Sequence, residues 1–259
     1  MEKYFEVTDM DINIKCKMFC KDPRNINSVL LACHGFGGNK ENSATKKLAK
    51  ILLERHEDVA VIAFDWPCHG QDFRQKLSLT DCNNYLQSMI DYIHKDLDVS
   101  NISVQGTSFG GYLILKYVSE HENPFEKIAL RCPAINMHQI LTSKLLSEEQ
   151  KENIKKGKVE VAGFSRKIKI TKEFLDELEL NDITKREYYD IADDTIVFQG
   201  TNDEIVDYDK VIQFCDDNVI DCIPIKGADH RFQDAAKMRE CIDYMAEFYE
   251  DVLSKKRTI

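Results

Sequence analysis

A serine between glycines, in the stretch GTSFGG at residues 106–111, is the feature of this sequence that most directly suggests chemistry. It fits the pattern Gly-x-Ser-x-Gly, and it lies between an apolar run predicted as a strand and a helical pattern. A serine at so tight a turn is held in a strained backbone conformation, and the flanking glycines leave room where a Cβ atom would clash. The pattern therefore predicts that Ser108 is a nucleophile. The alternative is a glycine-rich turn that merely packs a helix on a strand.

A serine nucleophile needs a general base, and the base needs a carboxylate that orients it. Asp203 lies in the loop after the predicted strand 194–199, and His230 lies in the loop after the predicted strand 221–226. In open parallel sheets, ligands bind at the edge where the carboxyl ends of the strands meet. We therefore expect Ser108, Asp203 and His230 to converge at this edge.

Two other carboxylates near Asp203 remain candidates for the orienting acid. Glu204 and Asp207 follow in the same loop, and Asp203 could instead cap a helix that begins near Asp207. The base has fewer alternatives, because the six other histidines lie in glycine turns or on and beside helices, whereas His230 follows a late strand. The neighbouring Asp229 is expected to point away, since adjacent residues at a strand end face opposite sides.

A second glycine-rich stretch, HGFGG at residues 34–38, follows the early apolar run 29–34. The loop after an early strand can supply one half of an oxyanion hole, and the residue after the nucleophile supplies the other half. We expect the backbone N–H groups of Phe36 and Phe109 to be these donors, the alternative being an ordinary glycine-rich turn. Neither glycine stretch fits the spacing of a phosphate-binding loop.

The histidine and cysteine spacing does not indicate a metal site. Neither HExxH nor CxxC occurs, and His56-Glu57 is not followed by a second histidine at the required offset. We therefore expect no bound metal and no cofactor. The nine cysteines are scattered and odd in number, which favours reduced thiols in a cytoplasmic protein.

Charge and hydropathy narrow the classes of partner. The chain has 35 basic and 45 acidic residues, a net charge of −10, and an acidic surface repels nucleic-acid backbones and anionic lipids. Residues 1–14 have no basic segment followed by an apolar run, so no secretory signal is expected there. No stretch approaches the roughly 18 apolar residues of a spanning helix. Nucleic acid and membrane are not expected as partners, and a homodimer is left open.

The order of the predicted elements indicates the α/β class. A length of 259 residues fits one domain with an insertion. Short apolar runs alternate with helical patterns, which predicts a mostly parallel central sheet with helices on both faces. An alternating pattern near the start predicts an antiparallel pair at one edge, over residues 4–7 and 12–19. The other predicted strands are 29–34, 59–64, 101–105, 127–132, 194–199 and 221–226, and the predicted helices are 42–56, 81–96, 110–120, 207–216 and 235–253.

The interval 134–190 breaks this alternation, because its 57 residues separate two strands that a single helix could connect. We interpret it as an inserted cap, or lid, on a core formed by residues 1–133 and 191–259. Ser147 and Gln150 form a plausible capping box for a first helix. Beyond it we predict β character over 159–170 and a second helix over 173–179.

The insertion leaves and re-enters the sheet at its C-terminal edge, so we expect it to lie over Ser108. Some of its apolar side chains should line a substrate pocket, and the pocket candidates are Phe164, Leu145 and Met137. The alternative for any one of them is that it only attaches the cap to the core. The apolar residues concerned are Ile135, Met137, Ile140, Leu141, Leu145, Leu146, Phe164 and Phe174.

Taken together, these residues resemble the serine α/β-hydrolase family over nearly the whole chain. The resemblance rests on residues 34–38, on Asp65 to Gly70 (DWPCHG) and on the Ser108 turn. It also rests on Asp203 and His230 in the family's order. Within the family the chain is most similar to bacterial cinnamoyl/feruloyl esterase-like hydrolases with an inserted cap, because GADH at 227–230 is close to their histidine segment.

The resemblance implies an α/β-hydrolase fold and hydrolysis of a small-molecule carboxylic ester through an acyl-enzyme. Two departures concern the shape of the pocket. Pro67-Cys68 stand before His69 where an Arg-Gly or Asn-Gly pair is common, and Thr107 and Phe109 replace the usual His and Gln. The same catalytic groups would serve a thioesterase, an acyltransferase or a peptidase. A catalytically silent binding module is the alternative from another class.

Overall fold

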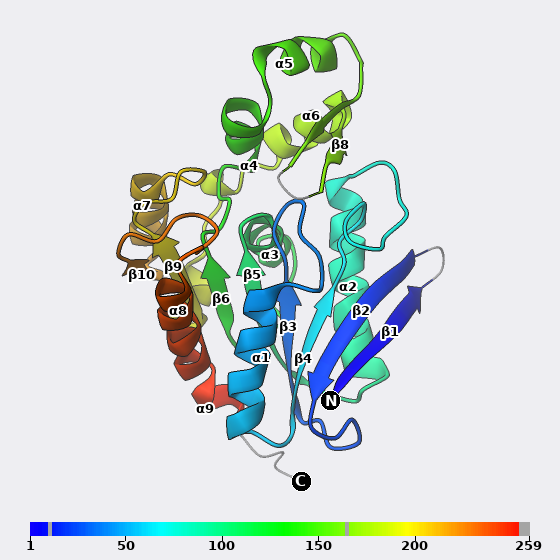
Figure 1. Cartoon of the computed structure of the whole chain (residues 1–259), viewed down its shortest axis with the longest axis vertical. Coiled ribbons are helices and arrows are strands. Elements are labelled where there is room, and N and C mark those ends of the chain that lie inside the picture. Colours follow the sequence, from blue (N-terminus) through cyan, green and yellow to red (C-terminus); the bar gives the residue numbers. More distant parts are fainter. Residues whose placement is uncertain (10–11, 164–165, 254–259) are drawn as a thin grey trace.

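The structure is a computed structural model that describes residues 1–9, 12–163 and 166–253. Its central element is an eight-stranded sheet in the order β1-β2-β4-β3-β5-β6-β9-β10 (Figure 1). The six strands from β4 to β10 in this order run parallel, whereas β2 is antiparallel to both β1 and β4. This confirms the predicted mostly parallel sheet with an antiparallel pair at one edge. The strands are β1 (Glu2–Asp9), β2 (Ile12–Cys20), β3 (Ser28–Cys33), β4 (Val59–Phe64), β5 (Asn101–Thr107), β6 (Ile128–Arg131), β9 (Thr195–Gly200) and β10 (Asp221–Ile225).

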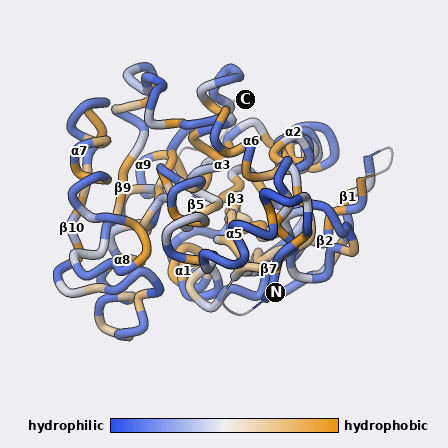
Figure 2. Tube along the Cα trace, turned by 90° about the horizontal axis from the view of Figure 1, so that it is seen from above, coloured by the Kyte–Doolittle hydropathy of each residue, from blue (hydrophilic) through white to orange (hydrophobic). Residues whose placement is uncertain are grey.

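The strands in the middle of the sheet are apolar along almost their whole length. Every residue of β3 and of β4 is buried, because helices cover both faces of the sheet and leave no side open to solvent. The edge strand β1 has mostly exposed residues instead. Seen from above, β3 and β9 are coloured towards the hydrophobic end of the scale, whereas the surrounding helices show alternating hydrophobic and hydrophilic bands (Figure 2).

Apolar packing forms two buried clusters, one on each face of the sheet. Helices α1 and α8 pack against each other and supply one cluster. Helices α2, α3 and α7 supply the other. The sheet is therefore enclosed between two helical layers, and the loops at its C-terminal edge remain available for a site. The helices of these layers are α1 (Ser43–Arg55), α2 (Leu79–Lys95), α3 (Phe109–Val118), α7 (Tyr208–Asn218) and α8 (Ala235–Phe248), followed by α9 (Glu250–Leu253).

Polar side chains determine where several helices begin. The hydroxyl of Ser78 accepts a hydrogen bond from the backbone N–H of Asp81 at 3.1 Å, so α2 begins before its predicted start at residue 81. The helix predicted over 235–253 is divided at Tyr249 into α8 and α9. The phenol of Tyr249 donates a hydrogen bond to the carbonyl oxygen of Val104 inside the core, at 2.7 Å.

Residues 134–190, called the inserted segment below, leave the sheet at the C-terminal end of β6, and α4, α5 and α6 lie beyond the C-terminal ends of the strands (Figure 1). The expectation that the segment also re-enters the sheet at this edge is wrong: β9 is parallel to β6, so the chain runs back to the N-terminal end of β9. The capping box of Ser147 and Gln150 is present at the start of α5. The segment also contains a π-helical stretch, in which Leu146 donates to the carbonyl of Leu141; a pattern of period 3.6 does not predict it. Its elements are α4 (Met137–Ile140), the π-helix Leu141–Leu145, α5 (Glu148–Lys155), β7 (Glu160–Ala162), β8 (Ile168–Ile170), α6 (Lys172–Leu180) and the 3-10 helices Ile183–Lys185 and Tyr189–Asp194.

The inserted segment packs directly on the helices below it. Its buried apolar residues, among them Ile154, Ile170 and Phe174, belong to the same cluster as those of α2 and α3. The carboxylate of Glu177 accepts a hydrogen bond from the backbone N–H of Leu79 at the start of α2, at 2.7 Å. The segment therefore shares a core with the sheet rather than forming a separate one.

Candidate active site

The structure brings the three residues predicted for catalysis together at the C-terminal edge of the sheet. The hydroxyl of Ser108 lies 3.0 Å from Nε2 of His230. On the other side of the ring, Nδ1 of His230 lies 2.8 Å from Oδ2 of Asp203. The three side chains come from the ends of β5, β9 and β10. They form a continuous chain of hydrogen bonds from a hydroxyl through an imidazole to a carboxylate.

The backbone at Ser108 has the strained conformation that the glycine pattern predicts. Its φ of 52° and ψ of −113° lie in a region that residues with a side chain rarely adopt. A Cβ atom on Gly110 would lie 2.4 Å from the carbonyl oxygen of Cys33, so a side chain there would push α3 away from β3. The Ser108 N–H donates to the carbonyl of Arg131, and the Ser108 carbonyl accepts from Ala134, both at 3.0 Å. These bonds hold the turn in place.

Hydrogen bonds from the surrounding chain hold Asp203 in its ionised form. Its Oδ1 accepts from the backbone N–H groups of Ile205 and Val206 at 2.9 and 2.8 Å, and its Oδ2 accepts from the amide of Gln199 at 3.1 Å. Burial alone would raise the pKa of Asp203, but the hydrogen bond and charge of His230 and the Val206 amide hold that pKa below its usual value. The carboxylate can therefore orient the ring and stabilise it when it becomes charged.

The other acidic candidates occupy different positions. Glu204 accepts a hydrogen bond from the backbone N–H of His230 at 3.2 Å, and Asp207 caps the start of α7. Asp229 accepts from the backbone N–H of Arg231 within its own turn, at 2.9 Å. Of the carboxylates considered from the sequence, the side chain of Asp203 is the one that contacts the imidazole ring.

The two backbone amides expected to bind an oxyanion are next to Ser108. Phe109 follows it at the start of α3, and the adjoining Gly35 is so close that a Cβ atom there would lie 3.2 Å from the Cβ of Ser108. Neither the N–H of Phe36 nor that of Phe109 donates a hydrogen bond to a described residue. Both amides can therefore donate to an incoming oxygen.

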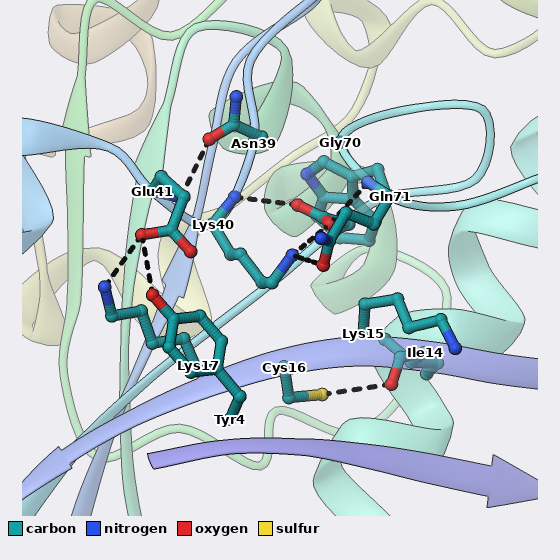
Figure 3. A network of polar contacts seen from close by, with 12 residues as sticks. Tyr4, Ile14, Lys15, Cys16, Lys17, Asn39, Lys40, Glu41, Gly70 and Gln71 are labelled. Carbon is teal, nitrogen blue, oxygen red and sulfur yellow. Dashed lines mark hydrogen bonds and ion pairs between the residues drawn. The ribbon is translucent and has the colours of Figure 1, made fainter. Parts of the chain in front are cut away.

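A buried ion pair that the sequence analysis did not identify anchors the loop that carries Phe36 (Figure 3). The Lys40 ammonium lies 2.7 Å from Oδ2 of Asp65, and the Lys40 backbone N–H donates to Oδ1 at 2.8 Å. The backbone N–H of Gln71 also donates to Oδ2, and its side-chain oxygen accepts from the same ammonium. The Asp65 side chain has no exposed surface. The sequence motif around Asp65 was noted, but nothing in the spacing indicates that Lys40 reaches it.

Two buried histidines support the same loop. His34 donates from Nδ1 to the carbonyl of Gly35 at 2.8 Å, and its Nε2 accepts from the backbone N–H of Trp66 at 3.3 Å. The His69 ring packs edge-on against Phe36 and stacks near Phe109. Burial lowers the pKa of His34 to about 4 and that of His69 to about 3. Both rings are therefore neutral at pH 7, and they act as structural groups.

A cavity of about 350 Å³ lies over Ser108 and His230 and is lined in part by the inserted segment. Met137 and Leu145, two of the three pocket candidates, are among its lining residues, together with Ile140. The third candidate, Phe164, lies outside the described residues. A larger hollow of about 700 Å³ lies between α4, α6 and α7, and none of the three triad residues lines it. The predicted triad therefore lies at the smaller cavity.

Cys132, Asp203 and His230 each place one potential metal-binding atom within 4.8 Å of the others. The Asp203 and His230 atoms already take part in the hydrogen bonds described above. Burial raises the pKa of the Cys132 thiol well above its usual range, and a metal binds the thiolate. The donor set therefore fits proton transfer better than metal binding.

Comparison with solved structures identifies chains of the same architecture. Est1E from Butyrivibrio proteoclasticus, in a structure with bound ferulic acid, is 19% identical over 97% of this chain and 100% of its own, with a TM-score of 0.77. Mouse alpha/beta hydrolase domain-containing protein 10 is 17% identical over 96% of this chain and 99% of its own, with a TM-score of 0.71. No curated protein matches the chain in sequence. At these identities the similarity concerns the fold.

Two further findings concern the chain as a whole. A search of the described residues finds no helix long and apolar enough to cross a membrane. The family model for the alpha/beta hydrolase fold matches residues 28–162, just over half of the 259 residues. This match includes the glycine loop, the Asp65 turn and the Ser108 turn, and the sheet order and the structural neighbours agree with it. The chain belongs to the α/β-hydrolase family.

Proposed function

We propose that this protein is a serine hydrolase that cleaves small carboxylic esters through an acyl-enzyme intermediate. The observation that carries the proposal is the continuous hydrogen-bonded chain Ser108, His230, Asp203. It begins on a strained turn, beside two amides that donate to none of the described residues. A hydroxyl is a weak nucleophile unless a neighbouring base removes its proton. This arrangement supplies that base and orients it.

In the acylation step, Ser108 attacks the carbonyl carbon of the ester while its proton moves to Nε2 of His230. Negative charge then develops on the carbonyl oxygen, and the N–H groups of Phe36 and Phe109 donate hydrogen bonds to it. The imidazolium is stabilised by the carboxylate of Asp203. When the carbon–oxygen bond of the ester breaks, His230 gives its proton to the departing alcohol, and the acyl group remains on Ser108.

In the deacylation step, water takes the place of the alcohol. His230 accepts a proton from the water as its oxygen attacks the acyl carbon, and the same two amides bind the oxyanion. The bond to Ser108 then breaks, and His230 returns a proton to the serine oxygen. The products are a carboxylic acid, an alcohol and the regenerated enzyme.

The inserted segment is proposed to act as a cap that forms one wall of the acyl or alcohol pocket. Met137, Ile140 and Leu145 line the cavity over Ser108, and pockets lined mainly by apolar groups bind apolar parts of ligands. The ferulic acid bound to the structurally similar Est1E supports aromatic acids as the first acyl groups to test. The nine free cysteines support a reducing compartment such as the cytoplasm.

An active-site label tests the proposal directly. A fluorophosphonate probe should add one adduct to the intact protein, and the Ser108→Ala variant should show neither the adduct nor ester turnover. A matched Ser119→Ala variant, at the far end of α3, should label as the wild type does. Labelling that persists in Ser108→Ala would contradict the assignment, and an unlabelled wild type would favour a silent binding module. A panel of aryl, short-chain and thioesters then defines the bond that is cleaved.

A further inference from the structure

We propose that Arg131 binds an anionic group of the substrate, a carboxylate, inside the catalytic cavity. The inference rests on the proposed ester hydrolysis and narrows its substrate class. It starts from the position of Arg131 at the end of β6, where the residue pairs with Thr107, the residue before the nucleophile. The Arg131 carbonyl accepts the N–H of Ser108, and Arg131 lines the same cavity as Ser108 and His230.

Arg131 is a buried charge without an ionic partner in the part of the chain that the structure describes. The residue is 5% exposed, and no carboxylate of the described residues lies within 4.0 Å of its guanidinium. Its side-chain contacts are a weak hydrogen bond from Nη1 to the sulfur of Met238 at 3.4 Å and the ring of Phe232, 5.2 Å from the guanidinium. An arginine side chain has five N–H donors. A buried charge is costly unless an opposite charge or strong acceptors compensate it.

The nitrogens of Arg131 that make no hydrogen bond are not completely enclosed, and the residue lines the cavity. Polar side-chain atoms that are completely enclosed and lack a partner occur at several described residues, and no atom of Arg131 is among them. The guanidinium nitrogens that make no hydrogen bond therefore retain accessible surface, although the residue as a whole is buried. A ligand in the cavity can supply the missing acceptors, and a carboxylate matches the planar fork of a guanidinium with two parallel hydrogen bonds.

The charges around the cavity also favour an anion. The whole chain carries a net charge of −10, yet the formally charged side chains that line this cavity are Arg131, Arg231 and Glu41. The carboxylate of Glu41 is already paired with the ammonium of Lys17 at 2.7 Å. An acidic protein has thus placed two arginines at the proposed catalytic centre, and neither forms an ion pair with a carboxylate of the described residues.

Substrate pairs that differ by one charge separate this role from a structural one. On the acyl side, the pair is mono(4-nitrophenyl) adipate and the corresponding terminal amide. On the alcohol side, the pair is 4-acetoxybenzoate and 4-acetoxybenzamide. Each pair is assayed with the wild type, Arg131→Gln, Arg131→Lys and Arg231→Gln, and Arg239→Gln, an exposed arginine on α8, is the matched control. Thermal unfolding of each variant checks that it is folded.

For one of the two pairs, we expect Arg131→Gln to lower kcat/KM for the carboxylate member by about 10- to 100-fold, the usual range for a lost charge-assisted hydrogen bond. The amide member should change less than threefold, and Arg131→Lys should recover part of the loss. The pair that responds shows whether the anion lies on the acyl or the alcohol side. Equal losses for the carboxylate and amide members in both pairs would overturn the proposal, as would a preference that depends on Arg231 alone.

A binding measurement keeps the proposal testable if the ester chemistry fails. Should the wild type cleave none of the four esters and take no fluorophosphonate label, the proposed function is wrong. The thermal stability of the Ser108→Ala variant is then measured with 4-acetoxybenzoate or adipate, and it tests whether the cavity binds an anion. Stabilisation that disappears in the Ser108→Ala/Arg131→Gln variant supports it, and the absence of stabilisation contradicts it.

Discussion

The C-terminal edge of the sheet and the inserted segment line the same cavity, but they are built differently. At the sheet edge, short hydrogen bonds hold Asp203 and the network around Asp65. The inserted segment consists of short helices and two strands of three residues each, and it meets the cavity with apolar side chains. We expect changes at the sheet edge to affect the reaction itself, whereas changes in the inserted segment should affect the choice of substrate.

The largest effect is expected from the triad. Asp203→Asn and His230→Ala should each lower kcat by about three orders of magnitude or more, because the imidazole loses its orientation or is absent. Glu204→Gln and Asp207→Asn are the matched controls and should retain most of the activity. Near-normal kcat in Asp203→Asn, together with a large loss in one of the controls, would show that the carboxylate changed in that control orients His230 instead of Asp203. Circular dichroism establishes that each variant is folded.

The buried ion pair below the glycine loop should affect stability as well as turnover. Lys40→Met leaves the Asp65 carboxylate buried without its ammonium, and breaking such a pair costs about 3 to 5 kcal/mol of unfolding free energy. Because the pair anchors the loop that carries Phe36, kcat should also fall. Urea unfolding measures the first effect and ester turnover the second. Lys46→Met, which removes an exposed lysine on α1, is the control and should change neither. A Lys40→Met variant of wild-type stability would refute the anchoring role.

The two buried histidines that support the glycine loop make the fold sensitive to acid. Burial lowers the pKa of His34 to about 4 and of His69 to about 3, whereas an unfolded histidine titrates near about 6.5. Between these values the unfolded chain binds protons that the folded chain does not. The unfolding free energy should therefore fall as the pH drops below about 6.5, by up to about 1.4 kcal/mol per pH unit for each ring.

Replacing one ring with an aromatic residue that does not titrate checks this slope. His69→Phe keeps a ring between Phe36 and Phe109 and should reduce the slope between pH 6.5 and 4.5. Exposed His94 on α2 provides the control, since His94→Phe should leave the slope close to that of the wild type. Equal slopes for wild type and His69→Phe, measured by urea unfolding at several pH values, would contradict the assignment.

The sequence predicted those parts of the fold that depend on local pattern. The apolar run 59–64 corresponds residue for residue to β4. A strand covered on both faces is apolar along its whole length, so its two ends can be recognised in the sequence. The candidate triad came from loops after predicted strands, a rule of sheet topology that does not require coordinates. The structure brings those residues together, and their catalytic roles stay predictions.

Contacts between distant residues could not be predicted in this way. Lys40 and Asp65 are 25 positions apart, and their pairing depends on how two loops pack at the sheet edge. The sequence shows Arg131 as no more than a polar residue at the end of an apolar strand. Its lack of an ionic partner becomes visible once α8 and the loop before it are in place. The π-helix at 141–145 has no pattern that distinguishes it from an α-helix.

The smallest effect is expected within the inserted segment, and it tests the comparison most sensitively. Leu145 lines the cavity over Ser108, whereas its neighbour Leu146 is buried but does not line it. Leu145→Ala should change the ratio of kcat/KM between aromatic and short aliphatic esters, since a lost methylene-sized contact is worth about 1 to 3 kcal/mol in a pocket. Leu146→Ala removes the same atoms from the packing below and should lower stability without changing that ratio. If both variants keep the wild-type ratio within about twofold, Leu145 does not select the substrate. An equal change in kcat for all esters would instead show that Leu145 affects the reaction itself, as the residues of the sheet edge are expected to do.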